Sequence, residues 1–146
     1  MFNLTDSKRR LIWHGMFLFL LGLLTGLAEQ QFTNPRMGLA AHLEGLMNGI
    51  FLIALGAVWL AVGLSVTLKA WTYWIVLYGT YANWAMTTLA AILGVASLSP
   101  ITGAGHSAPP WQELSITVGF GTVGIAMIAS SILILWGLRR QDSQPA

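Results

Sequence analysis

The 146-residue sequence is 55% hydrophobic and only 8% charged, with a net charge of +2 and no cysteine. A soluble domain carries about 25% charged residues, and the mean hydropathy of +0.69 also indicates a membrane protein. The absence of cysteine excludes disulfides, thiolate metal sites and cysteine nucleophiles. The basic residues lie at the ends of apolar segments, where they set orientation in a bilayer. The positive charge therefore does not indicate a nucleic-acid partner.

Four apolar segments are each long enough to cross about 30 Å of hydrocarbon as a helix. The first is expected over residues 11–28, and we expect it to be retained, because no small-residue cleavage site follows a short apolar core. Asn34-Pro35 is typical of a helix cap followed by a first-turn proline, and it predicts a second helix over residues 36–64. A third helix is expected over residues 70–98. A loop rich in glycine and proline then separates it from a fourth over residues 111–138.

These segments predict an all-α integral membrane protein, an antiparallel four-helix bundle that forms a single membrane domain over residues 1–146. With four spans, both termini and the connection between the second and third helices share one face. That face holds Lys8, Arg9, Arg10, Lys69, Arg139 and Arg140, whereas the other face holds only Arg36. Cytoplasmic loops carry the excess of basic residues. We therefore expect a multi-pass membrane protein with both termini in the cytoplasm.

Polar side chains inside the predicted spans are costly, so each is a candidate functional residue. At 1.5 Å per residue, His42 lies ~9 Å below the outer face and Asn48 ~18 Å below it. Asn83 and Thr87, on the third helix, fall in the same outer half as His42. A histidine or asparagine in a span can also serve only as a hydrogen-bonding link between helices. The residue pattern leaves both readings open.

Three other ionisable residues have simpler interpretations. Glu44, four residues before Asn48 on the same helix face, can reach interfacial water or pair with Arg36. His14 lies only ~6 Å from the inner face, which predicts a supporting role. His106 falls in the loop and is expected to be solvated.

His42 shares a helix face with two glycines, because His42, Gly45 and Gly49 fall within about 60° of one another at 100° per residue. Such an arrangement is typical of a porphyrin lying against a helix: the imidazole binds the iron and the glycines admit the macrocycle. Small residues at this spacing also let two helices approach closely. The sequence does not choose between these uses.

Three stretches, RLIWHGMFL (10–18), NPRMGLAAHLEGLMNG (34–49) and YGTYANW (78–84), resemble the bacterial hydroxylaminobenzene mutases. The resemblance covers nearly the whole chain. These small membrane enzymes move the hydroxyl group of an arylhydroxylamine from nitrogen to the ring. The resemblance implies an isomerase of aromatic compound degradation that converts hydroxylaminobenzene, a small aromatic substrate, to 2-aminophenol.

Shorter pieces are similar to styrene oxide isomerase, a four-helix membrane enzyme that contains haem b and assembles as a trimer. They are His14-Gly15, the His42-x5-Asn48-Gly49 spacing and Ala82-Asn83. In that enzyme the motif histidine ligates the haem iron and the motif asparagine contacts the substrate. The similarity thus implies His42 as the iron ligand and assembly as a homo-oligomer, which in that enzyme is a trimer. Thr87 stands where the isomerase has a catalytic tyrosine, which favours a substrate other than an epoxide.

Together these resemblances imply haem b whose ferric iron acts as a Lewis acid on the substrate oxygen. The expected cofactor-binding residues are His42, Gly45, Gly49 and Tyr81, with His42 bound to the metal. The expected catalytic residues are Asn48, Asn83 and Thr87, which would orient the substrate N–H or O–H. Two alternatives remain: an epoxide isomerase on the same scaffold, and a non-enzymatic membrane haem protein.

Overall fold

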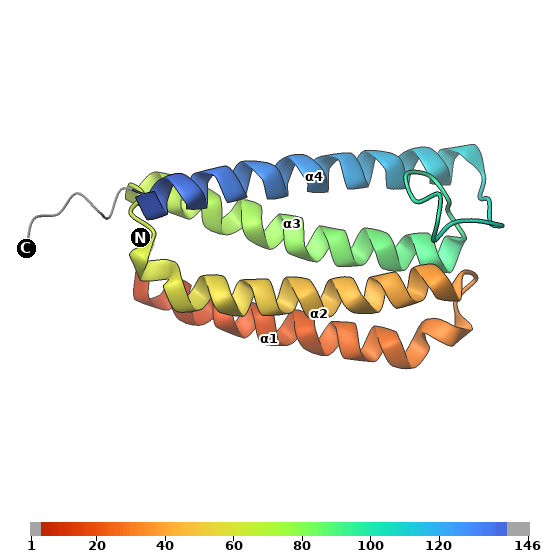
Figure 1. The fold of residues 1–146 in the computed structure, drawn as a ribbon, viewed down its shortest axis with the longest axis horizontal. Coiled ribbons are helices and arrows are strands. Elements are labelled where there is room, and N and C mark those ends of the chain that lie inside the picture. Colours follow the sequence, from red (N-terminus) through yellow and green to blue (C-terminus); the bar gives the residue numbers. More distant parts are fainter. Residues whose placement is uncertain (1–3, 140–146) are drawn as a thin grey trace, which may run out of the picture.

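In the computed structural model, which describes residues 4–139, those residues form four α-helices. The helices are α1 (Leu4–Ala28), α2 (Pro35–Val58), α3 (Val66–Leu93) and α4 (Pro110–Arg139), and short 3-10 helices η1 (Glu29–Gln31) and η2 (Trp59–Ala61) follow α1 and α2. Successive helices run in opposite directions, so the start of α1, the α2–α3 connection and the end of α4 lie together (Figure 1). The predicted all-α antiparallel four-helix architecture is confirmed.

Capping residues decide where the helices begin and end. At the start of α2, the Asn34 side chain accepts a hydrogen bond from the Met37 N–H at 3.2 Å, and Pro35 occupies the first turn, as predicted. α3 begins at Val66 rather than at residue 70, because Ser65 caps it. It ends at Leu93 rather than at residue 98, because Gly94 adopts a left-handed φ of 70°.

Glycines bring the backbones of α1 and α2 into direct contact. A Cβ atom on Gly45 would lie 2.4 Å from the Cα of Gly22, and one on Gly49 would lie 2.7 Å from the carbonyl oxygen of Gly15. A larger residue does not fit at such distances without moving a helix. α1 and α2 are therefore fixed closely side by side.

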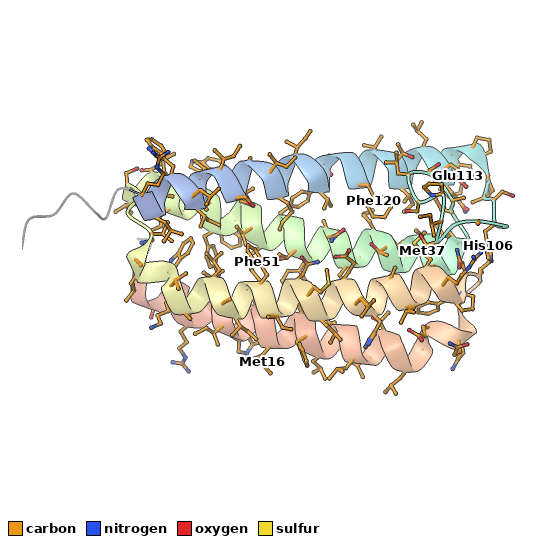
Figure 2. The ribbon with its side chains drawn as sticks, in the orientation of Figure 1. Met16, Met37, Phe51, His106, Glu113 and Phe120 are labelled. Carbon is orange, nitrogen blue, oxygen red and sulfur yellow. The ribbon has the colours of Figure 1, made fainter. Side chains whose placement is uncertain are left out.

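The other two helices pack more loosely. α3 contacts both α2 and α4, whereas α4 packs mainly on α3. One apolar core includes Leu18, Leu52 and Val76 from α1, α2 and α3. A second contains Met37, and Phe120 packs against it; Figure 2 shows these two side chains toward the end of the bundle where the α3–α4 loop lies.

Among the described residues, three segments are long and apolar enough to cross a membrane: Asp6–Gln31, Pro35–Ala61 and Pro110–Arg139. α3 is not one of them, since it carries polar side chains such as Thr80 and Asn83 on its length. α2 ends and α4 begins at opposite ends of the bundle (Figure 1). If both cross a bilayer, α3 must cross as well, and its 28 residues are long enough at about 42 Å. Arg140, one of the residues used to predict orientation, lies outside the described residues.

Candidate functional site

The contact between α2 and α3 contains a carboxylate held by two amides. Asn48 Nδ2 donates to Glu44 Oε2 at 3.1 Å, and Asn83 Nδ2 donates to the same oxygen at 2.5 Å. Asn48 is buried, whereas Glu44 and Asn83 are half-buried. The structure thus brings two of the predicted catalytic residues together around Glu44. Glu44 was expected to reach interfacial water or to pair with Arg36; it does not pair with Arg36, and its contact with water stays a prediction.

Thr87 lies one turn beyond Asn83 on α3. It is buried, and its hydroxyl donates to the carbonyl oxygen of Asn83 at 2.8 Å. The hydroxyl proton is thereby bound within α3, as is usual for threonine in an apolar helix. A catalytic role of Thr87 stays a prediction.

Two further polar contacts join α1 to α3. The phenol oxygen of Tyr81 lies 3.0 Å from His14 Nδ1. One turn further along α3, Trp84 Nε1 donates to Thr25 Oγ1 at 3.0 Å. Tyr81 is therefore placed beside His14, and its contact with a cofactor stays a prediction. Sequence reasoning did not identify the contact between Trp84 and Thr25.

His42 points to the opposite side of α2 from Glu44. Its Nδ1 lies 2.8 Å from the carbonyl oxygen of Gly22 on α1. The ring packs over Gly26, where a Cβ atom would come within 2.5 Å of Nδ1. Two residues along a helix correspond to a rotation of 200°, so the two side chains point about 160° apart.

The hydrogen bond of His42 fixes which ring nitrogen is available. A carbonyl oxygen only accepts, so Nδ1 carries the proton and Nε2 keeps its lone pair. Within residues 4–139, Nε2 has no hydrogen-bond partner. Metal-ligating histidines commonly donate their other N–H to a backbone carbonyl in this way. His42 therefore fits a metal ligand.

The described residues contain no group of three or more His, Cys, Asp or Glu side chains that could hold a bare ion. A haem iron needs only a single protein ligand on one side, because the porphyrin supplies four nitrogens. A single histidine such as His42 is therefore sufficient as a protein ligand for a haem, and haem binding stays a prediction.

Gly45 and Gly49 face α1, as their contacts with Gly22 and Gly15 show. Of the two uses that the sequence allowed, close helix approach is the one these contacts demonstrate. Contact of either glycine with a cofactor stays a prediction.

The α3–α4 loop is tied to the ends of the helices. Glu113 in the first turn of α4 accepts hydrogen bonds from the backbone N–H groups of Ala96, Ser97 and Ala108, at 3.2, 2.8 and 3.0 Å, and from the Ser97 hydroxyl. Figure 2 shows Glu113 and His106 at this end of the molecule. Sequence reasoning missed this role, because an acidic residue in a first helical turn also occurs simply to complement the helix dipole.

Two residues near this loop differ from their predicted environments. Arg36 donates to the carbonyl oxygen of Ala104 and does not pair with Glu44. His106 is half-buried rather than solvated, and its Nε2 lies 3.1 Å from the carbonyl oxygen of Thr33. Both side chains fasten the loop to the start of α2.

Comparison with known proteins gives consistent similarities over most of the chain. A family model described as styrene oxide isomerase matches residues 7–139. Hydroxylaminobenzene mutase HabB of Ectopseudomonas oleovorans is 42% identical over 138 residues, which cover 92% of this chain and 84% of HabB. Hydroxylaminobenzene mutase HabA of the same organism is 42% identical over 127 residues, which cover 86% of this chain and 94% of HabA. No solved structure matches the chain.

Proposed function

The chain belongs to the styrene oxide isomerase family, and from this premise we propose that it converts hydroxylaminobenzene to 2-aminophenol. The chain is an enzyme of the isomerase class. The observation that supports this particular reaction is the 42% identity, over most of both chains, to two enzymes named for it. The same identity argues against the alternative of a non-enzymatic membrane haem protein.

The proposed reaction defines what the protein must provide. The N–O bond of the substrate breaks and a C–O bond forms at the ortho carbon. The ortho hydrogen leaves as a proton, and the nitrogen gains one, so substrate and product are isomers. No external oxidant or reductant is consumed. The protein must help oxygen leave nitrogen, hold the N–H and O–H groups, and keep competing water away.

We propose His42 as the residue that binds haem b. The Gly22 carbonyl fixes the ring orientation and keeps the proton on Nδ1, so Nε2 is presented for ligation. When bound, ferric haem supplies a Lewis acid for the substrate oxygen. Gly26 supports this placement from α1, since any side chain there would meet the imidazole.

We propose that Asn48 and Asn83 orient the substrate together with the carboxylate between them. Each amide donates one N–H to Glu44, and each retains a second N–H and a carbonyl oxygen. The surrounding helices are apolar, which limits the access of water. A lipophilic arylhydroxylamine would reach such a site through the bilayer.

The opposite directions of His42 and Glu44 have a consequence for assembly. A single chain cannot present both side chains to one small aromatic ring, because α2 itself lies between them. We propose that the site forms between copies, with the His42 side of one chain facing the Glu44 side of the next. Such a head-to-tail contact closes into a ring when its rotation permits, and a homotrimer is the ring that the resemblance implies.

The closest rival is epoxide isomerisation, which the description of the matching family model favours. Kinetics with purified protein on hydroxylaminobenzene and styrene oxide separate the two. We expect 2-aminophenol to form with a kcat/KM at least tenfold above that for isomerisation of styrene oxide. A preference for styrene oxide would contradict the proposal and establish the alternative.

A further inference from the structure

Only one of the two carboxylate oxygens of Glu44 accepts hydrogen bonds from the described residues. Asn48 and Asn83 both donate to Oε2, and within residues 4–139 Oε1 receives no hydrogen bond. The partners of Glu44 are two neutral amides, and no basic side chain is among them. A half-buried carboxylate in an apolar helix is costly unless its oxygens are hydrogen-bonded. The unused oxygen therefore marks a place for a hydrogen-bond donor.

We infer that Glu44 is the specificity-determining residue of the substrate site, and that its Oε1 accepts the N–H of the arylhydroxylamine. This inference rests on the proposed function and deepens it. A carboxylate oxygen selects for ligands that donate and against ligands that only accept. Hydroxylaminobenzene has an N–H beside the N–O bond that breaks, whereas an epoxide has no donor. Glu44 thus explains, within one residue, a preference for arylhydroxylamines over epoxides.

A purely architectural role for Glu44 is the competing explanation, because its hydrogen bonds join α2 to α3. The two roles differ in their response to the substrate. Loss of an architectural residue lowers turnover of every substrate by the same factor. Loss of an N–H acceptor lowers turnover only for substrates that carry the N–H group.

Glu44→Gln separates these roles without removing the side chain. Because both asparagines donate to Oε2, the glutamine carbonyl takes that position. Its NH2 group then occupies the place of Oε1, where it cannot accept. The links to Asn48 and Asn83 remain, whereas the proposed acceptor and the negative charge are lost. Only loss of the acceptor distinguishes a substrate with an N–H group from one without it. Glu29→Gln, in the short helix η1 outside the site, is the matched control.

The test uses two substrates, hydroxylaminobenzene and its N-methyl derivative, which keeps the O–H but lacks the N–H. A hydrogen bond to a charged group corresponds to roughly 10- to 100-fold in kcat/KM. We expect the wild-type protein and Glu29→Gln to prefer hydroxylaminobenzene by that factor. In Glu44→Gln the preference should fall to within about threefold, because hydroxylaminobenzene alone loses turnover.

Equal losses for both substrates in Glu44→Gln, or a wild-type protein with no preference, would overturn the role of Glu44 and leave the proposed reaction standing. A wild-type protein that turns over neither substrate would overturn both.

A second measurement uses the wild-type protein alone and compares its inhibition by aniline, which has N–H groups, and by N,N-dimethylaniline, which has none. The inference requires aniline to inhibit at least about tenfold more tightly, and equal inhibition would overturn it.

Discussion

The carboxylates of Glu113 and Glu44 differ in how many of their oxygen atoms accept hydrogen bonds. Glu113 accepts from three backbone N–H groups and one hydroxyl, and both of its oxygens take part. Glu44 uses a single oxygen, which is shared by two amides. The first carboxylate is fully used in holding the α3–α4 loop. The second keeps capacity for a ligand, and this difference cannot be read from the sequence, where both are single glutamates in apolar helices.

Each of the three histidines has one ring nitrogen in a hydrogen bond, so hydrogen bonding alone does not rank them as metal ligands. His14 Nδ1 is paired with the Tyr81 hydroxyl, and His106 Nε2 with the Thr33 carbonyl. His42 has its Nδ1 paired with a carbonyl of a neighbouring helix and lies in the predicted outer half of the span. The sequence favoured His42 over the other two histidines, because it lies deeper in a predicted membrane span. Which ring nitrogen of His42 is hydrogen-bonded could be learned only from the structure, because its partner Gly22 is 20 residues away along the chain.

At the scale of helices, the pairing of α1 with α2 depends on glycine. In Gly45→Ala the new methyl group would lie 2.4 Å from the Gly22 Cα atom, and backbone cannot turn aside as a flexible side chain can. Overpacking of this kind costs about 1–3 kcal/mol. We expect thermal unfolding in detergent to shift down by several degrees, as followed by circular dichroism.

Gly124→Ala provides the control, since nothing lies within 4 Å of a Cβ atom at that position on α4. Its unfolding temperature should be unchanged or slightly higher, because alanine favours helix more than glycine does. If the two variants unfold at the same temperature, the glycine contact between α1 and α2 does not limit stability.

The sequence predicted the number, order and direction of the helices, because long apolar segments and the turn residues between them are local signals. α3 has the weaker apolar signal of the four. It predicted the start of α2 from Asn34-Pro35, where the cap is encoded locally. It placed the end of α3 too late, at residue 98 instead of Leu93, because the apolar residues beyond Gly94 resemble a continuing span. The left-handed turn at Gly94 is a conformational choice that composition does not reveal.

The sequence singled out Asn48 and Asn83 as candidates, but it did not predict that they meet at Glu44. Helical phase correctly placed Glu44 beside Asn48, since they share one helix. It could not show that Asn83 joins them from α3, or that Trp84 contacts Thr25. Contacts between helices depend on their rotation about their axes, which a single sequence leaves open.

For the whole molecule, the central prediction is that two copies complete one site. His42→Ala and Asn83→Ala should each abolish turnover alone. In mixed oligomers formed by co-expression, about a quarter of the sites would combine an intact His42 with an intact Asn83 from the adjacent chain. We therefore expect activity to reappear at about a quarter of the wild-type level. Mixed oligomers without activity would place both residues of a working site on the same chain.

The absorption spectrum of the detergent-purified protein, recorded together with turnover of hydroxylaminobenzene, tests the assignment of a haem to His42 most directly. We expect a Soret band in the wild-type protein and in His106→Ala, in which the loop histidine is removed. Both the band and formation of 2-aminophenol should be lost in His42→Ala, because Nε2 of that residue is the proposed iron ligand. An active wild-type protein without a Soret band, or a His42→Ala variant that keeps both haem and turnover, would contradict the assignment.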